Sequence, residues 1–441
     1  MISGASGPMR RAVKGVRADT ERQTLELYAD RRHALGGRAL LQHFNPYLLP
    51  IDDLKRACEA NGQAFLNFAE YDYLSLGKDE RVLEAAKRAI DVFGIGAGAS
   101  RLVGGERSVH SELEAKLASF VGTQDALALV SGYGTNVGLV SHLLTTNDLI
   151  VVDEYSHNSI MVGARLSRAE TRIFAHNDLA DLATILEEER GRFQRVLVIT
   201  EGLYSMEGDI PDLPLLLDIC ERHDAWLLID EAHSIGVLGA TGRGITEHFG
   251  IDPNRIDLIV GTLSKAFAAC GGFVCGKASV IDWLRYSLNG FIYSVGLPPH
   301  IACAVQTAVS VLEAEPERVE QLTRLSQHFV AEAGRNGFDV GTAIGAGVVP
   351  IMFDDPVATL MASKALLTEG IYVPPVVQIG VPKDKPRLRF FLTTAHTEAD
   401  LGRVFGVLCD WRQAYPAVRA RHGSTIAAIE HAHAHLAAAG E

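Results

Sequence analysis

Short apolar runs alternate with helix-patterned stretches through the middle of the chain. Continuous apolar runs, rather than alternating ones, are typical of strands buried on both faces of a sheet. Helical stretches between the runs predict βα crossovers, and therefore a mostly parallel sheet with helices on both faces. Ligands bind such sheets at the carboxyl ends of the strands. The apolar runs span 126–130, 148–153, 195–202, 225–233, 257–265 and 271–276.

The pattern changes on either side of this region. Before it, residues 79–94 place apolar side chains at helical spacing and end on a glycine. After residue 300, helical stretches precede short strands, which predicts a smaller α+β unit. We therefore predict an N-terminal helical arm at 1–70, a large α/β domain at 71–300 and a C-terminal α+β domain at 301–441 that ends in an Ala/His-rich tail.

Composition and charge exclude several classes of protein. The 441 residues are 47% apolar and 22% charged, which is ordinary for a globular protein. A net charge of −13 argues against a nucleic-acid partner. Without an 18-residue apolar stretch the chain is expected to be cytoplasmic, with at most peripheral membrane contact. We predict no metal site, because the six cysteines form no CxxC pair and His431, His433 and His435 of the tail cannot share one helix face.

The run "WLLIDEAHSIG" at 226–236 has two interpretations. Asp-Glu-Ala-His after an apolar strand occurs in a class of helicases, and it also places an acid beneath the ring of pyridoxal 5′-phosphate (PLP). A helicase needs a GxxxxGK[ST] phosphate loop, and none precedes Asp230. A PLP enzyme needs a lysine for the Schiff base, which "GTLSKAF" supplies as Lys265 after the next strand. One βαβ step then brings the carboxylate and the amine side by side.

Other polar residues follow the same strands. "SGYGTN" at 131–136 opens a helix after a strand, and its small residues let backbone amides approach an anion. The remaining polar candidates at strand ends are Asp153, His157, Glu201 and His233.

Seven motifs occur in a fixed order over about residues 70–410: "SGYGTN", "DEYSHNSI", "EGLYSMEGDIPDL", "DEAHSIGVLGATGRG", "GTLSKAFAACGGF", "YSVGLPP" and "RLRFFLTTAHT". This set resembles the α-oxoamine synthases, a PLP-dependent transferase family of fold type I. Its members include serine palmitoyltransferase, 8-amino-7-oxononanoate synthase, glycine C-acetyltransferase and 5-aminolevulinate synthase. The resemblance also implies a homodimer with shared active sites.

The resemblance implies a role for each matching residue. Lys265 would form the Schiff base, Asp230 would face the pyridinium nitrogen, His157 would stack on the ring, and His233 and Ser205 would lie near the ring oxygen O3′. The phosphate contacts would be Gly132, Tyr133, Thr262, Ser264 and, from the second subunit, Ser294. The substrate contacts would be Arg389 for the amino-acid carboxylate, Tyr73 near the cofactor edge and His110.

Each of these residues also has a purely structural alternative. The alternatives are core imidazoles for His157 and His233, a strand surface charge for Arg389 beside Arg387, turn or helix caps for Ser205 and Ser264, and a helix cap for His110.

The reaction implied by the resemblance is a decarboxylative condensation of an amino acid with an acyl thioester to give a 2-amino ketone. Our leading expectation is L-serine with a long-chain acyl-CoA, as in serine palmitoyltransferase, on the basis of Ser100-Arg101 and the run "VPPVV". The alternatives are an 8-amino-7-oxononanoate synthase or glycine C-acetyltransferase type that uses alanine or glycine, a member that uses an acyl carrier protein, and an aminotransferase. The sequence departs from the family pattern at Asp72, Ala266 and Ala268.

Overall fold

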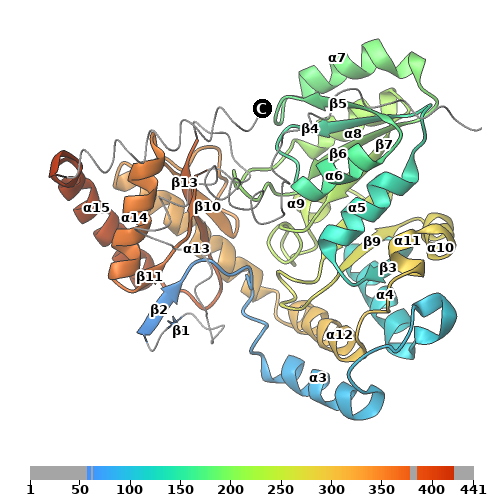
Figure 1. Ribbon diagram of the computed structural model, residues 1–441, viewed down its shortest axis with the longest axis horizontal. Helices are drawn as coiled ribbons and strands as arrows, with labels where there is room; N and C mark the ends of the chain where they lie inside the picture. The colour runs from blue at the N-terminus through green and yellow to red at the C-terminus, as the bar shows by residue number, and fades with distance from the viewer. Residues whose placement is uncertain (1–56, 61–62, 378–384, 422–441) are drawn as a thin grey trace, which may run out of the picture. The chain divides into compact units, whose positions relative to one another are not determined.

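The computed structural model describes residues 57–60, 63–377 and 385–421 (Figure 1). Pro46–Val418 form one compact unit, and the description below refers to that unit. Most of the predicted N-terminal arm and the tail histidines at 431, 433 and 435 lie outside the described residues.

A seven-stranded sheet forms the centre of the large domain, in the strand order β3-β9-β8-β7-β6-β4-β5. Strand β9 runs antiparallel to both of its neighbours, and every other neighbouring pair is parallel. The expected mostly parallel sheet is therefore confirmed. The strands are β3 (Asp125–Leu129), β4 (Leu149–Asp153), β5 (Glu170–Phe174), β6 (Val196–Glu201), β7 (Trp226–Asp230), β8 (Leu258–Thr262) and β9 (Gly272–Gly276).

Helices cover both faces of this sheet (Figure 1). Along β4, Leu149 and Val151 belong to one apolar cluster, whereas Ile150 and Val152 belong to the other. Because successive side chains of a strand point to opposite faces, each face of the sheet has its own core. One core includes α4 (Ser108–Val121), α7 (Leu179–Glu189), α8 (Leu213–Arg222) and α12 (Pro299–Ala314), and the other includes α5 (Gly132–Leu143), α6 (Asn158–Leu166), α10 (Ala278–Ser287) and α11 (Asn289–Ile292).

Two three-stranded sheets accompany the C-terminal helices. One is antiparallel, in the order β10-β13-β12, and the other has the order β1-β2-β11. Helix α14 packs on strands of both sheets. The bounds are β1 (Ala57–Ala60), β2 (Gln63–Asn67), α13 (Glu317–Arg335), β10 (Val348–Met352), α14 (Pro356–Thr368), β11 (Ile371–Tyr372), β12 (Pro375–Val376), β13 (Arg387–Phe391) and α15 (Glu398–Arg421).

Strands β1 and β2 differ from the helical arm expected over residues 1–70. They pair antiparallel with each other, and β2 pairs in parallel with β11, about 300 residues later in the chain. Pairing with so distant a strand decides the conformation of this segment, and no local pattern encodes it. The remaining elements are α3 (Glu80–Phe93), the π-helical turn Arg101–Gly105, α9 (Ile245–Phe249) and 3₁₀ turns at Arg190–Arg192 and Pro253–Arg255. None of the described helices combines the length and the apolar character needed to cross a bilayer.

Candidate active site

A cavity of about 200 Å³ opens at the carboxyl ends of β6, β7 and β8, beside the start of α5 and the loop that precedes α6. This is the edge at which ligands bind open α/β sheets. The structure brings eight of the predicted residues together in the lining, namely Gly132, Tyr133, His157, Asp230, His233, Thr262, Ser264 and Lys265. The lining also includes Asn136, Ser159, Glu201, Ala232, Val260 and Gly261.

Asp230 is the last residue of β7 and is almost fully buried. One carboxylate oxygen accepts a hydrogen bond from the Ala232 backbone N–H at 2.9 Å, and the other accepts one from Asn136 Nδ2 at 2.7 Å. Glu201 ends the neighbouring strand β6 and is the register partner of Asp230. Burial, and next the charge of Asp230, raise the pKa of Glu201 well above its usual value. Two acids therefore lie side by side, and the raised pKa of Glu201 favours its neutral form.

Lys265 follows β8 in a tight turn, in which its carbonyl accepts the Ala268 N–H at 2.8 Å. Burial lowers the pKa of Lys265 to about 8, although the charges of Asp230 and Glu201 oppose this shift. A substantial fraction of the amine is then neutral near pH 8, which is the form that attacks a carbonyl group. Ala268 has a φ of +50°, so the turn holds a residue with a side chain in the left-handed region.

An anion cradle lies at the start of α5. The first helical N–H groups, at Gly132 and Tyr133, have no acceptor within the helix. A Cβ atom on Gly132 would lie 2.8 Å from Thr262 Oγ1, and one on Gly272 would lie 2.6 Å from Gly132 Cα. The hydroxyl groups of Thr262 and Ser264 are 2.7 Å apart. These two glycines therefore permit a close approach of the backbone, which together with the hydroxyl groups suits a phosphate.

Two imidazoles line the cavity. The backbone N–H of His157 donates to Glu201 Oε1 at 2.5 Å, and its ring Nδ1 lies 2.7 Å from Ser159 Oγ. Nδ1 of His233 lies 2.8 Å from the hydroxyl group of the buried Tyr73. Burial lowers the pKa of both histidines, and the charge of Lys265 adds to this effect at His233. Both rings are therefore expected to be neutral at pH 7. Tyr73 therefore contacts His233 and is not itself part of the cavity lining.

Arg389 reaches this region from β13. Its guanidinium donates to the backbone carbonyl of Ser205 at 3.1 Å and lies over the Phe391 ring at 4.5 Å. Its charge lowers the pKa values of Lys265 and His233, so it acts electrostatically on the cavity. The strand-surface alternative for Arg389 depended on Arg387 beside it, but Arg387 is buried and pairs with Glu207 at 2.7 Å.

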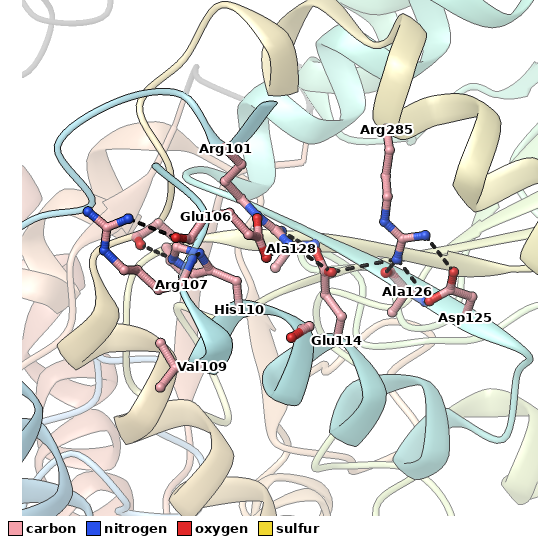
Figure 2. A network of polar contacts seen from close by, with 12 residues as sticks. Arg101, Glu106, Arg107, Val109, His110, Glu114, Asp125, Ala126, Ala128 and Arg285 are labelled. Atoms are coloured by element: carbon pink, nitrogen blue, oxygen red, sulfur yellow. Dashed lines mark hydrogen bonds and ion pairs between the residues drawn. The ribbon is translucent and has the colours of Figure 1, made fainter. Parts of the chain in front are cut away.

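Five predicted residues are not part of the described cavity lining, namely Tyr73 and Arg389, described above, and His110, Ser205 and Ser294. His110 is fully buried in the network of Figure 2. Its Nδ1 accepts the Arg107 backbone N–H at 3.1 Å, so its Nε2 donates to the Leu297 carbonyl at 2.6 Å. The helix-cap alternative is thus confirmed for His110, and both ring nitrogens are occupied away from the cavity. Ser205 contributes its carbonyl to Arg389, and Ser294 Oγ donates to the Val295 carbonyl at 3.3 Å.

Sequence reasoning missed Asn136 and Ser159 and assigned no role to Glu201. Asn136 lies one helical turn after Gly132, so helical spacing could have placed its side chain on the cavity side of α5. Ser159 lies two residues after His157, and no sequence signal shows that its hydroxyl group meets the ring.

The departure at Asp72 has a local explanation. Its two carboxylate oxygens accept the N–H groups of Leu76 and Gly77 at 2.8 and 2.9 Å. An asparagine could accept only through its single carbonyl oxygen. Asp72 therefore closes the loop that carries Tyr73.

The cavity fits PLP on chemical grounds. It offers an amine at Lys265, an acid at Asp230 and the anion cradle at the start of α5. A Cβ atom on Gly132 would block the close backbone approach in this cradle. In addition, Asn136 Oδ1 is buried at the cavity wall with no hydrogen-bond partner among the described residues. A polar group of this kind is normally satisfied by a ligand or by water.

Comparison with known proteins gives the family. Residues 63–408 match the family described as aminotransferase class I and II. The 8-amino-7-oxononanoate synthase of Fervidobacterium nodosum is 39% identical over 344 residues, which are 77% of this chain and 87% of that protein.

Solved structures agree with this assignment. A serine palmitoyltransferase variant from S. paucimobilis with a bound PLP–myriocin aldimine has a TM-score of 0.82 at 29% identity, covering 89% of this chain and 98% of that one. The 8-amino-7-oxononanoate synthase from Francisella tularensis has a TM-score of 0.70 at 25% identity, covering 80% and 98%. The expected fold type is confirmed, and the chain belongs to the class I and II aminotransferase family as a PLP-dependent α-oxoamine synthase.

Proposed function

We propose that this α-oxoamine synthase condenses L-alanine with an acyl thioester, with loss of CO2, as an 8-amino-7-oxononanoate synthase does. The amino-acid and acyl preferences are supported by the relative at 39% identity over 77% of the chain. The observation that carries the chemistry is the pairing of Lys265 and Asp230 in one cavity, with an amine whose pKa is about 8. Our leading expectation of L-serine and palmitoyl-CoA is therefore replaced by one of its alternatives.

Bound PLP supplies an electron-withdrawing ring that stabilises negative charge at the amino-acid Cα. Asp230 would accept a hydrogen bond from the ring nitrogen, and its two donors hold the carboxylate in place for this contact. His157 would lie over the ring and His233 beside its oxygen. The phosphate would be held by the α5 N-terminus and by the hydroxyl groups of Thr262 and Ser264.

Lys265 would then act as the base that takes the proton from the amino-acid Cα. A base is most effective when its pKa is near the working pH, and a value of about 8 meets this condition. Arg389 would orient the substrate carboxylate, because its guanidinium fork can form two parallel hydrogen bonds with a carboxylate. Its anchors at Ser205 and Phe391 restrict the positions that the fork can take.

The carbon skeleton of 8-amino-7-oxononanoate suggests both substrates. Its amino end is alanine without the carboxyl group, and the remainder is a seven-carbon acyl chain that ends in a carboxylate. The second candidate is L-serine with a long-chain acyl-CoA, which is favoured by the TM-score of 0.82 to a serine palmitoyltransferase. The acyl carrier, CoA or an acyl carrier protein, is left to experiment.

A homodimer is part of the proposal. Exposed apolar side chains lie on two segments, 92–103 and 293–296. The two segments are in contact, since the Gly296 N–H donates to the Ala99 carbonyl at 3.0 Å. Water-exposed apolar surface of this kind favours burial by a partner, and Ser294 lies within it. The exposed residues are Val92, Ile95, Leu102, Val103, Tyr293 and Val295.

The test is a substrate matrix with purified protein and PLP. L-Alanine, glycine and L-serine would each be combined with the CoA ester of a seven-carbon dicarboxylic acid and with palmitoyl-CoA. Thiol release and the mass of the product would be measured. We expect turnover with alanine and the dicarboxylic ester, abolished in Lys265→Ala and preserved in the surface control Lys277→Ala. Turnover confined to serine with palmitoyl-CoA would select the second candidate, and amino transfer without thiol release would contradict both.

A further inference from the structure

The amide group of Asn136 lies between the acid and the imidazole of the site. Its Nδ2 is 2.7 Å from Asp230 Oδ2 and 3.0 Å from Ser159 Oγ. Ser159 Oγ is in turn 2.7 Å from His157 Nδ1. Asn136 and Ser159 are almost fully buried, so water does not replace these contacts. A continuous chain of hydrogen bonds therefore runs from the carboxylate to the ring.

The direction of each hydrogen bond follows from the available hydrogens. Asn136 Nδ2 carries two, and it donates one to the carboxylate and the other to Ser159 Oγ. The hydroxyl hydrogen of Ser159 is then left for His157 Nδ1. The backbone N–H of Ser159 also points to Nδ1, at 3.3 Å. Two donors meet at this nitrogen, so it must be an acceptor.

The opposite tautomer would leave hydrogens without acceptors. A proton on Nδ1 would face the backbone N–H of Ser159, so two donors would meet. The Ser159 hydroxyl oxygen would then accept hydrogen bonds from both Asn136 Nδ2 and His157 Nδ1. Its own hydrogen, in a fully buried side chain, would have no acceptor. A buried polar group without a hydrogen-bond partner is destabilising, so this tautomer is disfavoured. Glu201 adds a further constraint, because it holds the backbone of His157 while Ser159 holds its ring.

We propose that Asn136 and Ser159 are positioning residues that join Asp230 to His157 and keep the proton of the neutral imidazole on Nε2. This inference rests on the proposed function only in treating His157 as the residue that covers the cofactor ring. It deepens that function, because Nε2–H becomes the one ring group of His157 that is free to donate to cofactor or substrate. It also predicts that the orientation of His157 depends on the two side chains and on Asp230 together.

The primary measurement is the tautomer of His157, by ¹⁵N NMR of protein labelled at histidine, with and without PLP. The His157 signals would be assigned with His157→Asn. We expect a proton on Nε2 in wild type and a mixture of both tautomers in Ser159→Ala, which lacks the hydroxyl donor. The matched control is Ser156→Ala. Ser156 is also buried and lies next to His157, but its hydroxyl group has no partner among the described residues. The control should leave the signals unchanged.

The second measurement is the dissociation constant of PLP, followed by absorbance. Ser159→Ala should bind PLP about 3- to 10-fold more weakly, the value of one hydrogen bond. We call the hydrogen-bonded chain Asp230–Asn136–Ser159–His157 the relay. If the relay acts as a unit, the double variant Asn136→Ala/Ser159→Ala should weaken PLP binding by less than the product of the two single effects. Independent effects, or tautomer signals in Ser159→Ala identical to those of Ser156→Ala, would overturn the relay.

The outcomes separate this inference from the proposed function. A proton on Nδ1 in wild-type protein would refute the relay even if Ser159→Ala failed to fold. Normal tautomer results in a protein that turned over no thioester would leave the relay standing and refute the proposed reaction.

Discussion

His176 provides the sharpest test of the electrostatics outside the cavity. It lies after β5, between the carboxylates of Asp153 and Asp209. Its Nδ1 is 2.9 Å from Asp153, and its Nε2 is 3.1 Å from Asp209. Tyr155 stacks on the ring with centroids 4.5 Å apart. Because both ring nitrogens face carboxylates, the ring must carry two protons, and therefore a positive charge, to donate to both.

The expected magnitude follows from the pKa. Burial alone would lower the pKa of His176, but the hydrogen bonds to Asp153 and then Asp209 outweigh it and raise the value from 6.5 to about 10. At ~1.4 kcal/mol per pKa unit this rise corresponds to at most about 5 kcal/mol. The side chain is still 12% exposed, and partial hydration screens the pairs, so we expect about 2–3 kcal/mol.

The stabilisation by His176 decreases as the pH rises. The folded protein binds this proton more tightly than the unfolded chain, so the stabilisation is complete below pH 6.5 and is lost as the pH rises to about 10. His176→Asn should lower the free energy of unfolding at pH 6, and the difference from wild type should shrink towards pH 10. The exposed His248→Asn should leave the stability nearly unchanged at either pH.

The assay is urea unfolding at a series of pH values, together with a direct titration of the His176 ring by NMR. A difference between wild type and His176→Asn that stayed constant from pH 6 to pH 10 would refute the reasoning. So would a measured pKa near 6.5, because the two carboxylates would then not be holding a charged ring.

Three further predictions concern other parts of the molecule. The rate of PLP binding to cofactor-free protein should rise with pH with a midpoint at about 8, because the neutral amine of Lys265 attacks; a midpoint near 10.5, measured by stopped-flow absorbance, would contradict the lowered pKa. Ala268→Gly should raise the free energy of unfolding by about 1 kcal/mol, because its φ of +50° suits glycine, whereas Ala269→Gly should not. Glu114→Gln should cost about 3 kcal/mol in urea unfolding, because Glu114 is buried against Arg101 (Figure 2); a loss under 1 kcal/mol would mean that Glu106 alone satisfies this arginine.

Much of the site was accessible from local sequence. Asp230 and Lys265 each end or follow an apolar run, and adjacent parallel strands end at the same edge of a sheet. This rule alone predicts that the acid and the amine lie side by side. The glycines after β3 likewise predict an anion site, since the backbone N–H groups at a helix N-terminus can bind an anion without any particular side chain.

Distant segments decide other features. The ring nitrogens of His110 contact Arg107 and Leu297, a residue from far along the chain, and its substrate contact stays a prediction. The edge strand β5 went unpredicted because polar and half-exposed side chains interrupt its apolar pattern. Strand β2 depends on β11 for its pairing.

The chain by itself therefore determined the alternation of strands and helices in the large domain except for β5, the sheet edge that carries the chemistry, and the family. These features depend on periodicity and on neighbours within one βαβ unit. Only the tertiary structure decided which side chains satisfy one another: Asn136 between Asp230 and Ser159, and His176 between Asp153 and Asp209. The reason is that a buried polar atom must form a hydrogen bond with a group packed beside it, and that group can belong to any element of the fold.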